Sequence, residues 1–149
     1  MRVQITKRAD GAGLLRCTRD DGSVVWQKQP DRHAVHFALH DLTHFAVETT
    51  LCCRHGFFGL VAQGWDMDDV TGKGARGALP PEATQIESLV GLFDAERVSA
   101  TMWTTEEFNL VSKFRPLSEQ EISRIKACRG DLFARWFALG TGGTLELSF

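Results

Sequence analysis

Residues 3–27 read VQITKRADGAGLLRCTRDDGSVVWQ, and in this stretch two Asp-Gly pairs separate three short apolar runs. Asp10-Gly11 and Asp21-Gly22 are typical of tight turns between strands, because glycine readily adopts the positive φ angles that such turns require. The first run also alternates between apolar and polar residues, as a half-buried strand does. This pattern predicts a three-stranded antiparallel meander, whose second and third strands cover residues 14–19 and 23–27.

A sheet of this size requires other elements on its apolar face. Helices are expected to supply this cover, because apolar residues repeat with a helical period later in the chain. The predicted helices cover residues 40–53, 57–63 and about 81–98. Two more begin at the capping boxes of Thr104 and Ser118, and the second of these ends at about Gly140.

Three segments complete the predicted organisation. Residues 33–39 alternate, and they are compatible with either a fourth strand or the beginning of a helix. Residues 64–81 contain four glycines and predict a long loop. Residues 145–149 alternate cleanly and predict a strand that joins the N-terminal sheet. We therefore expect one α+β domain over residues 1–149, in which a small antiparallel sheet packs against four or five helices.

The composition disfavours several classes of protein. The chain has 149 residues with 17 basic and 19 acidic side chains, and its net charge of −2 argues against a nucleic-acid partner. No apolar run approaches the ~18 residues that span a bilayer, and the N-terminus does not have the pattern of a signal peptide. The four cysteines show no framework spacing. We expect a reduced, cytoplasmic protein with neither nucleic acid nor membrane as a partner.

The histidines are concentrated in one short segment. All five lie within residues 33–55, and residues 40–48 read His-Asp-Leu-Thr-His-Phe-Ala-Val-Glu. On a helix, His40, His44, Glu48 and Asp41 fall within roughly 100° of arc, opposite an apolar face. The surrounding residues 36–112 carry eleven acidic and four basic side chains, a balance that favours a cation as the ligand.

This pattern predicts a metal site with His40 and His44 as ligands, because imidazoles at i and i+4 can chelate a divalent ion, most simply Zn²⁺. His40 and Glu48 are ~12 Å apart along a helix axis. Glu48 is therefore either a ligand in a distorted site or a partner of His44, and His55 can supply a ligand from the returning chain. Asp41 points beside the metal, where it can accept a proton from bound water or orient a ligand. Four further residues rank after His55 as candidates for this ligand: Cys52, Cys53, Asp66 and Asp68.

Two resemblances follow from these residues. His40-Asp41-x-x-His44 resembles the His-Glu-x-x-His signature of zincin metalloproteases, with Asp41 at the position of their glutamate. The resemblance implies a zinc ion and a hydrolytic reaction. Residues 39–61, with the motif His-Asp-Leu-x-His-Phe-x-Val-Glu, are also similar to an uncharacterised family of small bacterial proteins, which implies no function.

Two functional hypotheses remain open. In the first, the chain is a metal-dependent, hydrolase-like protein that acts on a small-molecule or peptide ligand. In the second, the chain is a non-catalytic binding or structural protein, and its histidines form a hydrogen-bond network with Asp41 and Glu48. The metal content of the protein distinguishes the two hypotheses.

Overall fold

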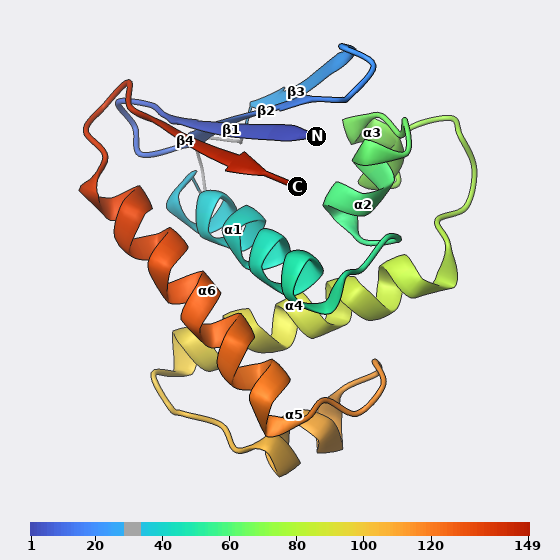
Figure 1. Ribbon diagram of the computed structural model, residues 1–149, viewed down its shortest axis with the longest axis vertical. Coiled ribbons are helices and arrows are strands. Elements are labelled where there is room, and N and C mark those ends of the chain that lie inside the picture. Colours follow the sequence, from blue (N-terminus) through green and yellow to red (C-terminus); the bar gives the residue numbers. More distant parts are fainter. Residues whose placement is uncertain (29–33) are drawn as a thin grey trace.

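The computed structural model describes residues 1–28 and 34–149. In the described part, four strands form one sheet and six helices lie beside it (Figure 1). The strands are β1 (Arg2–Lys7), β2 (Gly13–Thr18), β3 (Val24–Lys28) and β4 (Thr144–Ser148). The helices are α1 (Ala34–Leu51), α2 (Phe57–Ala62), α3 (Met67–Val70), α4 (Pro81–Ser99), α5 (Thr105–Val111) and α6 (Glu119–Ala138). The α+β prediction is confirmed, although the single-turn α3 in the predicted loop brings the helices to six.

The sheet is antiparallel, with the strand order β3-β2-β1-β4. The meander predicted from the two Asp-Gly turns is confirmed, and both turn glycines, Gly11 and Gly22, have positive φ angles of 80° and 86°. The C-terminal strand joins this sheet as predicted, and it pairs with β1, with Val3 opposite Leu147 and Ile5 opposite Leu145.

Helix α1 is the centre of the molecule, and it contacts β2, α2, α4 and α6 (Figure 1). It begins at Ala34, so the alternating residues from 34 onward belong to this helix and not to a fourth strand. His33 lies outside the described residues. Every residue from Asp41 to Glu48 is buried. Most of the polar face of this helix is therefore packed inside the protein, and His40 is half-buried.

Two apolar cores lie on different sides of α1. The first joins the sheet to α1, α2 and α6, and its largest members include Ile5, Leu42, Phe58 and Trp136. The second joins α1 to the three helices α4, α5 and α6, with Phe93 against Phe108 at a ring distance of 4.7 Å. Burial of each large apolar side chain contributes about 1.5–3 kcal/mol. The second core holds α4 against α1.

The two predicted capping boxes are confirmed. The hydroxyl of Thr104 accepts a hydrogen bond from the Glu107 amide at the start of α5, and Ser118 does the same with Glu121 at the start of α6. None of the helices in the described part of the chain is long and apolar enough to cross a membrane.

Candidate metal centre

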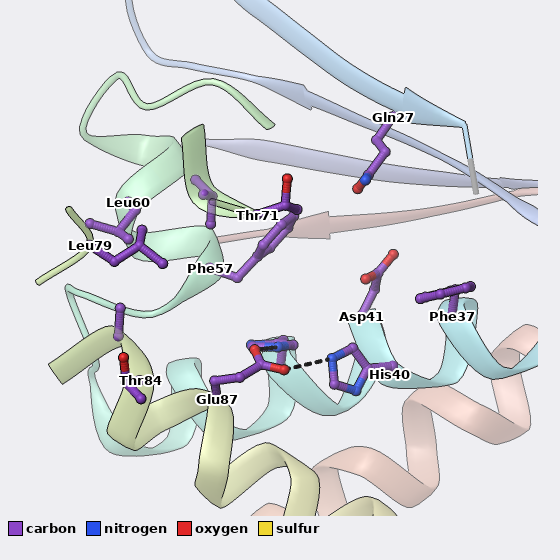
Figure 2. A pocket seen from close by; sticks show the side chains of 13 residues that line it. Gln27, Phe37, His40, Asp41, Phe57, Leu60, Thr71, Leu79, Thr84 and Glu87 are labelled. Atoms are coloured by element: carbon purple, nitrogen blue, oxygen red, sulfur yellow. Dashed lines mark ion pairs between the residues drawn. The ribbon is translucent and has the colours of Figure 1, made fainter. Parts of the chain in front are cut away.

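Three side chains from two helices converge between α1 and α4. His40 and His44 lie one turn apart on α1, with ring centroids 4.8 Å apart, and Glu87 reaches them from α4 (Figure 2). Glu87 Oε2 lies 3.0 Å from His44 Nε2, and Glu87 Oε1 lies 3.5 Å from His40 Nε2. Two ligands of a tetrahedral zinc ion are separated by roughly 3.3 Å, as follows from bonds of ~2.0 Å. These three residues are therefore positioned where they could hold a metal ion.

The other ring nitrogen of each histidine is held by a buried carboxylate. His40 Nδ1 lies 2.8 Å from Asp94 Oδ2, and His44 Nδ1 lies 3.1 Å from Glu48 Oε1. Because a carboxylate accepts hydrogen bonds, each Nδ1 carries a proton and donates it. Such partners orient the histidines of metal sites and leave the second nitrogen for the metal. Both Nε2 atoms are thus directed toward the same place.

Glu48 is held in position by the start of α2. Its carboxylate is fully buried and accepts hydrogen bonds from the backbone amides of Phe58 and Gly59, at 3.3 Å and 2.9 Å. Gly56 packs against the same carboxylate, so closely that a Cβ atom at this position would collide with it. The φ angle of Gly56 is −82°, which any residue can adopt. Space alone therefore requires glycine here.

Asp94 is also fixed by several groups. Its Oδ1 accepts a hydrogen bond from Arg97 Nε at 3.2 Å and lies 3.3 Å from the hydroxyl of Thr43. A second group that could hold a metal comprises His36, His40 and Asp94. An ion there would compete with the Arg97 guanidinium for the same carboxylate. The group formed by His40, His44 and Glu87 has no such cation beside it among the contacts of the described residues, and it is the stronger candidate.

Without a metal, the three converging groups form ion pairs. Burial opposes charge on His40, but its bonds with Asp94 and Glu87 raise its pKa to about 9. Burial likewise opposes charge on His44, and its bonds with Glu48 and Glu87 outweigh burial and raise its pKa to about 10. Hydrogen bonds from both histidines hold the pKa of Glu87 well below its usual range. Two imidazolium rings thus share one carboxylate at neutral pH, in the place where a cation would bind.

A pocket of about 380 Å³ opens beside these groups. His40, His44 and Glu87 contribute to its lining, and the side chain of Glu87 is 60% exposed (Figure 2). Asp41, the predicted acid–base residue, is buried and lines the same pocket, with its carboxyl group directed toward Gln27 of β3. Two of the predicted metal ligands, His40 and His44, and the predicted catalytic residue Asp41 therefore line one pocket.

The remaining predicted ligands lie elsewhere. Glu48 belongs to neither group that could hold a metal. It is a hydrogen-bond partner of His44, which is the second of the two roles that the sequence allowed. His55 is exposed between α1 and α2 and also belongs to neither group in the described part of the chain. The other candidates, Cys52, Cys53, Asp66 and Asp68, are not members of these groups either. Asp66 lies 3.7 Å from Arg19, and burial raises the pKa of Cys53 to about 11.

Glu87 and Asp94 are residues of the candidate site that the sequence did not indicate. Both lie on α4, seven residues apart and therefore on one face of the helix. Each directly follows a residue of the buried apolar stripe of this helix, which comprises Ile86, Leu89, Val90 and Phe93. This placement of acidic residues at the edge of a buried stripe is the signal that could have identified them, although it does not indicate their partner.

Comparisons with protein-family models, with curated proteins and with solved structures give no match to this chain. The function is therefore argued from the geometry of the site.

Proposed function

We propose that the protein binds one divalent metal ion, Zn²⁺ in the simplest case, through His40, His44 and Glu87, and that it acts as a metal-dependent hydrolase. The observation that carries this proposal is the direction of the two Nε2 atoms. Each histidine donates from Nδ1 to its own buried carboxylate, and each turns Nε2 toward Glu87. Two imidazoles and one carboxylate are a common ligand set of catalytic zinc, with a fourth position left for water or substrate.

The chemistry of a hydrolase follows from the same arrangement. A divalent ion polarises a carbonyl group and makes bound water more acidic. Asp41 lines the same pocket and is our candidate for the group that accepts the proton from this water. Glu48 and Asp94 keep the imidazole rings in orientation. Glu87, which is the most exposed of the three proposed ligands, faces the open side where a substrate enters.

Metal analysis tests the binding step. Protein purified without a histidine tag, incubated with Zn²⁺ and freed of excess metal, should retain about one ion per chain by elemental analysis. His44→Ala and Glu87→Gln should abolish retention. Glu82→Gln is the matched control, because Glu82 is an exposed glutamate in the first turn of the same helix, and this variant should retain the ion. Absence of stoichiometric metal after incubation with Zn²⁺, Ni²⁺ and Mn²⁺ would overturn the proposal.

Asp41→Asn tests the hydrolytic step. The variant should retain the metal and lose about 10²–10⁴-fold in the rate of hydrolysis of a p-nitrophenyl ester, the usual contribution of a general base. If the protein binds the metal but shows no metal-dependent hydrolysis, the proposed hydrolase activity would be wrong and the proposed metal binding would stand.

One observation favours a second function. The ion pairs between Glu87 and the two histidines are already formed at 3.0 Å and 3.5 Å, and a closed network of this kind can serve structure alone. In that case Glu87→Gln should lower the stability of the protein, and added Zn²⁺ should not raise its melting temperature.

A further inference from the structure

The pocket beside the proposed metal centre has apolar walls. Phe57, Leu60 and Leu79 lie on one side and Phe37 on the other (Figure 2). Phe57 also packs against the ring of His44, with ring centroids 5.7 Å apart. An apolar surface therefore begins directly at one of the proposed ligands. Apolar lining with a few polar groups is typical of sites that bind small molecules.

With a metal bound, the charges of the pocket's described lining residues are unfavourable for an anion, because His40 and His44 are then neutral ligands. Among its described lining residues there is no lysine or arginine, whereas Asp41 and Glu87 both contribute carboxyl groups. The N-terminus of α2, which could otherwise attract an anion, is occupied by the carboxylate of Glu48. A phosphate ester or a polycarboxylate would face these acidic groups with only the metal ion as a counter-charge.

The size of the pocket sets a further limit. Its volume of about 380 Å³ lies at the small end of the range of ~300–1,000 Å³ that small-molecule sites occupy. The uncharged polar side chains in its lining are Gln27, Thr71 and Thr84. A compact ligand with one polar end at the metal and an apolar remainder fits this distribution of groups.

We infer that the substrate class is an uncharged small molecule with one carbonyl group, an ester or amide, on a compact apolar body. The inference rests on the proposed function, because the carbonyl group is recognised by the metal ion. The apolar body lies against Phe57 and Leu79. Hydrolysis adds the hydroxyl of one water molecule to the carbonyl carbon, breaks its bond to the alcohol or amine, and transfers a proton to that leaving group.

Binding of hydroxamates to the cobalt-loaded protein tests this inference. Cobalt(II) replaces zinc with the same ligands and has visible absorption bands that change when another ligand coordinates it. Benzohydroxamate should bind about tenfold more tightly than acetohydroxamate, because its ring buries apolar surface against the pocket walls. Inorganic phosphate at millimolar concentration should leave the bands unchanged.

Two variants locate the effect in the pocket. Leu79→Ala should reduce the ratio of the two hydroxamate affinities by about threefold, because it shortens one apolar wall. Leu110→Ala is the control, since Leu110 is 85% exposed on α5, and it should leave the ratio unchanged.

The outcomes separate the two proposals. Equal affinities for the hydroxamates, or tighter binding of phosphate, would overturn the inference about the substrate and leave the metal centre intact. Failure of the protein to bind cobalt at all would overturn the proposed function, and the inference with it.

Discussion

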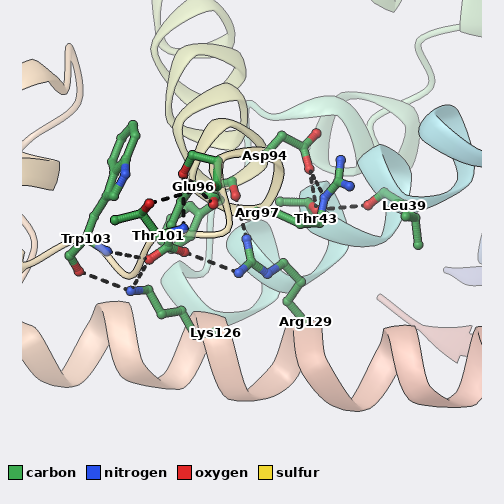
Figure 3. Close-up of polar contacts among 11 residues, drawn as sticks. Leu39, Thr43, Asp94, Glu96, Arg97, Thr101, Trp103, Lys126 and Arg129 are labelled. Atoms are coloured by element: carbon green, nitrogen blue, oxygen red, sulfur yellow. Dashed lines mark hydrogen bonds and ion pairs between the residues drawn. The ribbon is translucent and has the colours of Figure 1, made fainter.

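Asp94 and Glu96 are buried carboxylates only two residues apart on α4, yet they belong to two regions with different partners (Figure 3). Asp94 faces α1 and holds His40. Glu96 faces α6, where Lys126 Nζ lies 2.5 Å from Oε1 and Arg129 Nη2 lies 3.3 Å from Oε2. The backbone amide of Trp103 also donates to Glu96 at 3.0 Å. Glu96 is thus enclosed by donors.

The two regions differ in the kind of cation that their carboxylates contact. Lysine and arginine remain charged over the whole physiological pH range, so the ion pairs of Glu96 are permanent and hold α4 to α6. Arg129 also donates to the carbonyl of Phe93 at 2.6 Å, which reinforces the same junction. Histidine can release its proton, and it then offers a nitrogen lone pair to a metal. The Glu96 region is therefore fixed, whereas the charges around His40 and His44 can be exchanged for a metal ion.

The largest effect that we predict is on the pH dependence of metal binding. In the metal-free protein His40 and His44 are protonated at neutral pH, since their pKa values are raised to about 9 and about 10. A metal ion must displace one proton from each Nε2. Its dissociation constant should therefore fall by roughly 100-fold for each unit by which the pH rises, up to about pH 9. Titration calorimetry in buffers of different ionisation enthalpy should count about two protons released per ion.

The metal-free protein should respond to pH in the opposite sense. A histidine whose pKa is raised by folding contributes stability that is complete below its unfolded pKa of ~6.5 and is lost as pH rises through the folded value. The free energy of unfolding of the metal-free protein should therefore decrease between pH 6.5 and about 10. Zinc should remove this decrease. A metal affinity that does not depend on pH would contradict the proposed ligands.

The second prediction separates the two regions by mutation. Glu96→Gln leaves Lys126 and Arg129 without their buried counter-charge and should cost about 3–5 kcal/mol in the free energy of unfolding. Glu87→Gln changes a side chain that is 60% exposed and should cost less than about 1 kcal/mol. Zinc affinity should show the reverse order, with loss only in the Glu87 variant. Denaturant unfolding and zinc titration of both variants measure this, and equal loss of zinc affinity would mean that the regions are not independent.

The sequence predicted the fold well where the signals were local. The two Asp-Gly turns and the two capping boxes are each defined by adjacent residues, and all four are confirmed. The start of α1 was the open point: residues 33–39 are compatible with a strand or with the beginning of a helix, and the helix begins at Ala34. The apolar and polar residues of 33–39 alternate, and this period of two does not distinguish a strand from the first turns of a helix.

The site shows the same division between local and distant signals. His40 and His44 are one turn apart, and their proximity is a property of any helix. Asp94, the partner of His40, lies 54 residues from it along the chain, and only the packing of α4 on α1 brings the two together. Spacing alone could not distinguish Glu48 as a ligand from Glu48 as a support of His44. The backbone amides of Phe58 and Gly59 bind the Glu48 carboxylate and favour its role as a support of His44.

The third prediction concerns the support of His44. Gly56→Ala places a methyl group against the carboxylate of Glu48, and overpacking of this kind costs about 1–3 kcal/mol. Displacement of Glu48 should also misorient His44 and weaken zinc binding about tenfold. Gly91→Ala is the matched control, because nothing lies near its Cβ position on the exposed side of α4. It should stabilise the protein by up to ~1 kcal/mol. Unchanged zinc affinity in Gly56→Ala would show that Glu48 does not orient the ligand.

The smallest effect is expected at the N-terminus of α6, the helix that supplies Lys126 and Arg129 to Glu96. Ser118→Ala removes the hydroxyl that accepts the Glu121 amide at 3.2 Å, and loss of such a cap costs about 0.5–2 kcal/mol. Ser123→Ala is the control, since Ser123 is exposed one turn further along the same helix and caps nothing in the described structure. Zinc affinity should be the same in both variants, because the cap acts on the region held by Glu96 alone. A Ser118 variant as stable as the Ser123 variant would mean that α6 does not depend on this cap. A Ser118 variant with weakened zinc binding would show that the junction of α4 and α6 also positions Asp94, and the two regions would then be coupled through α4.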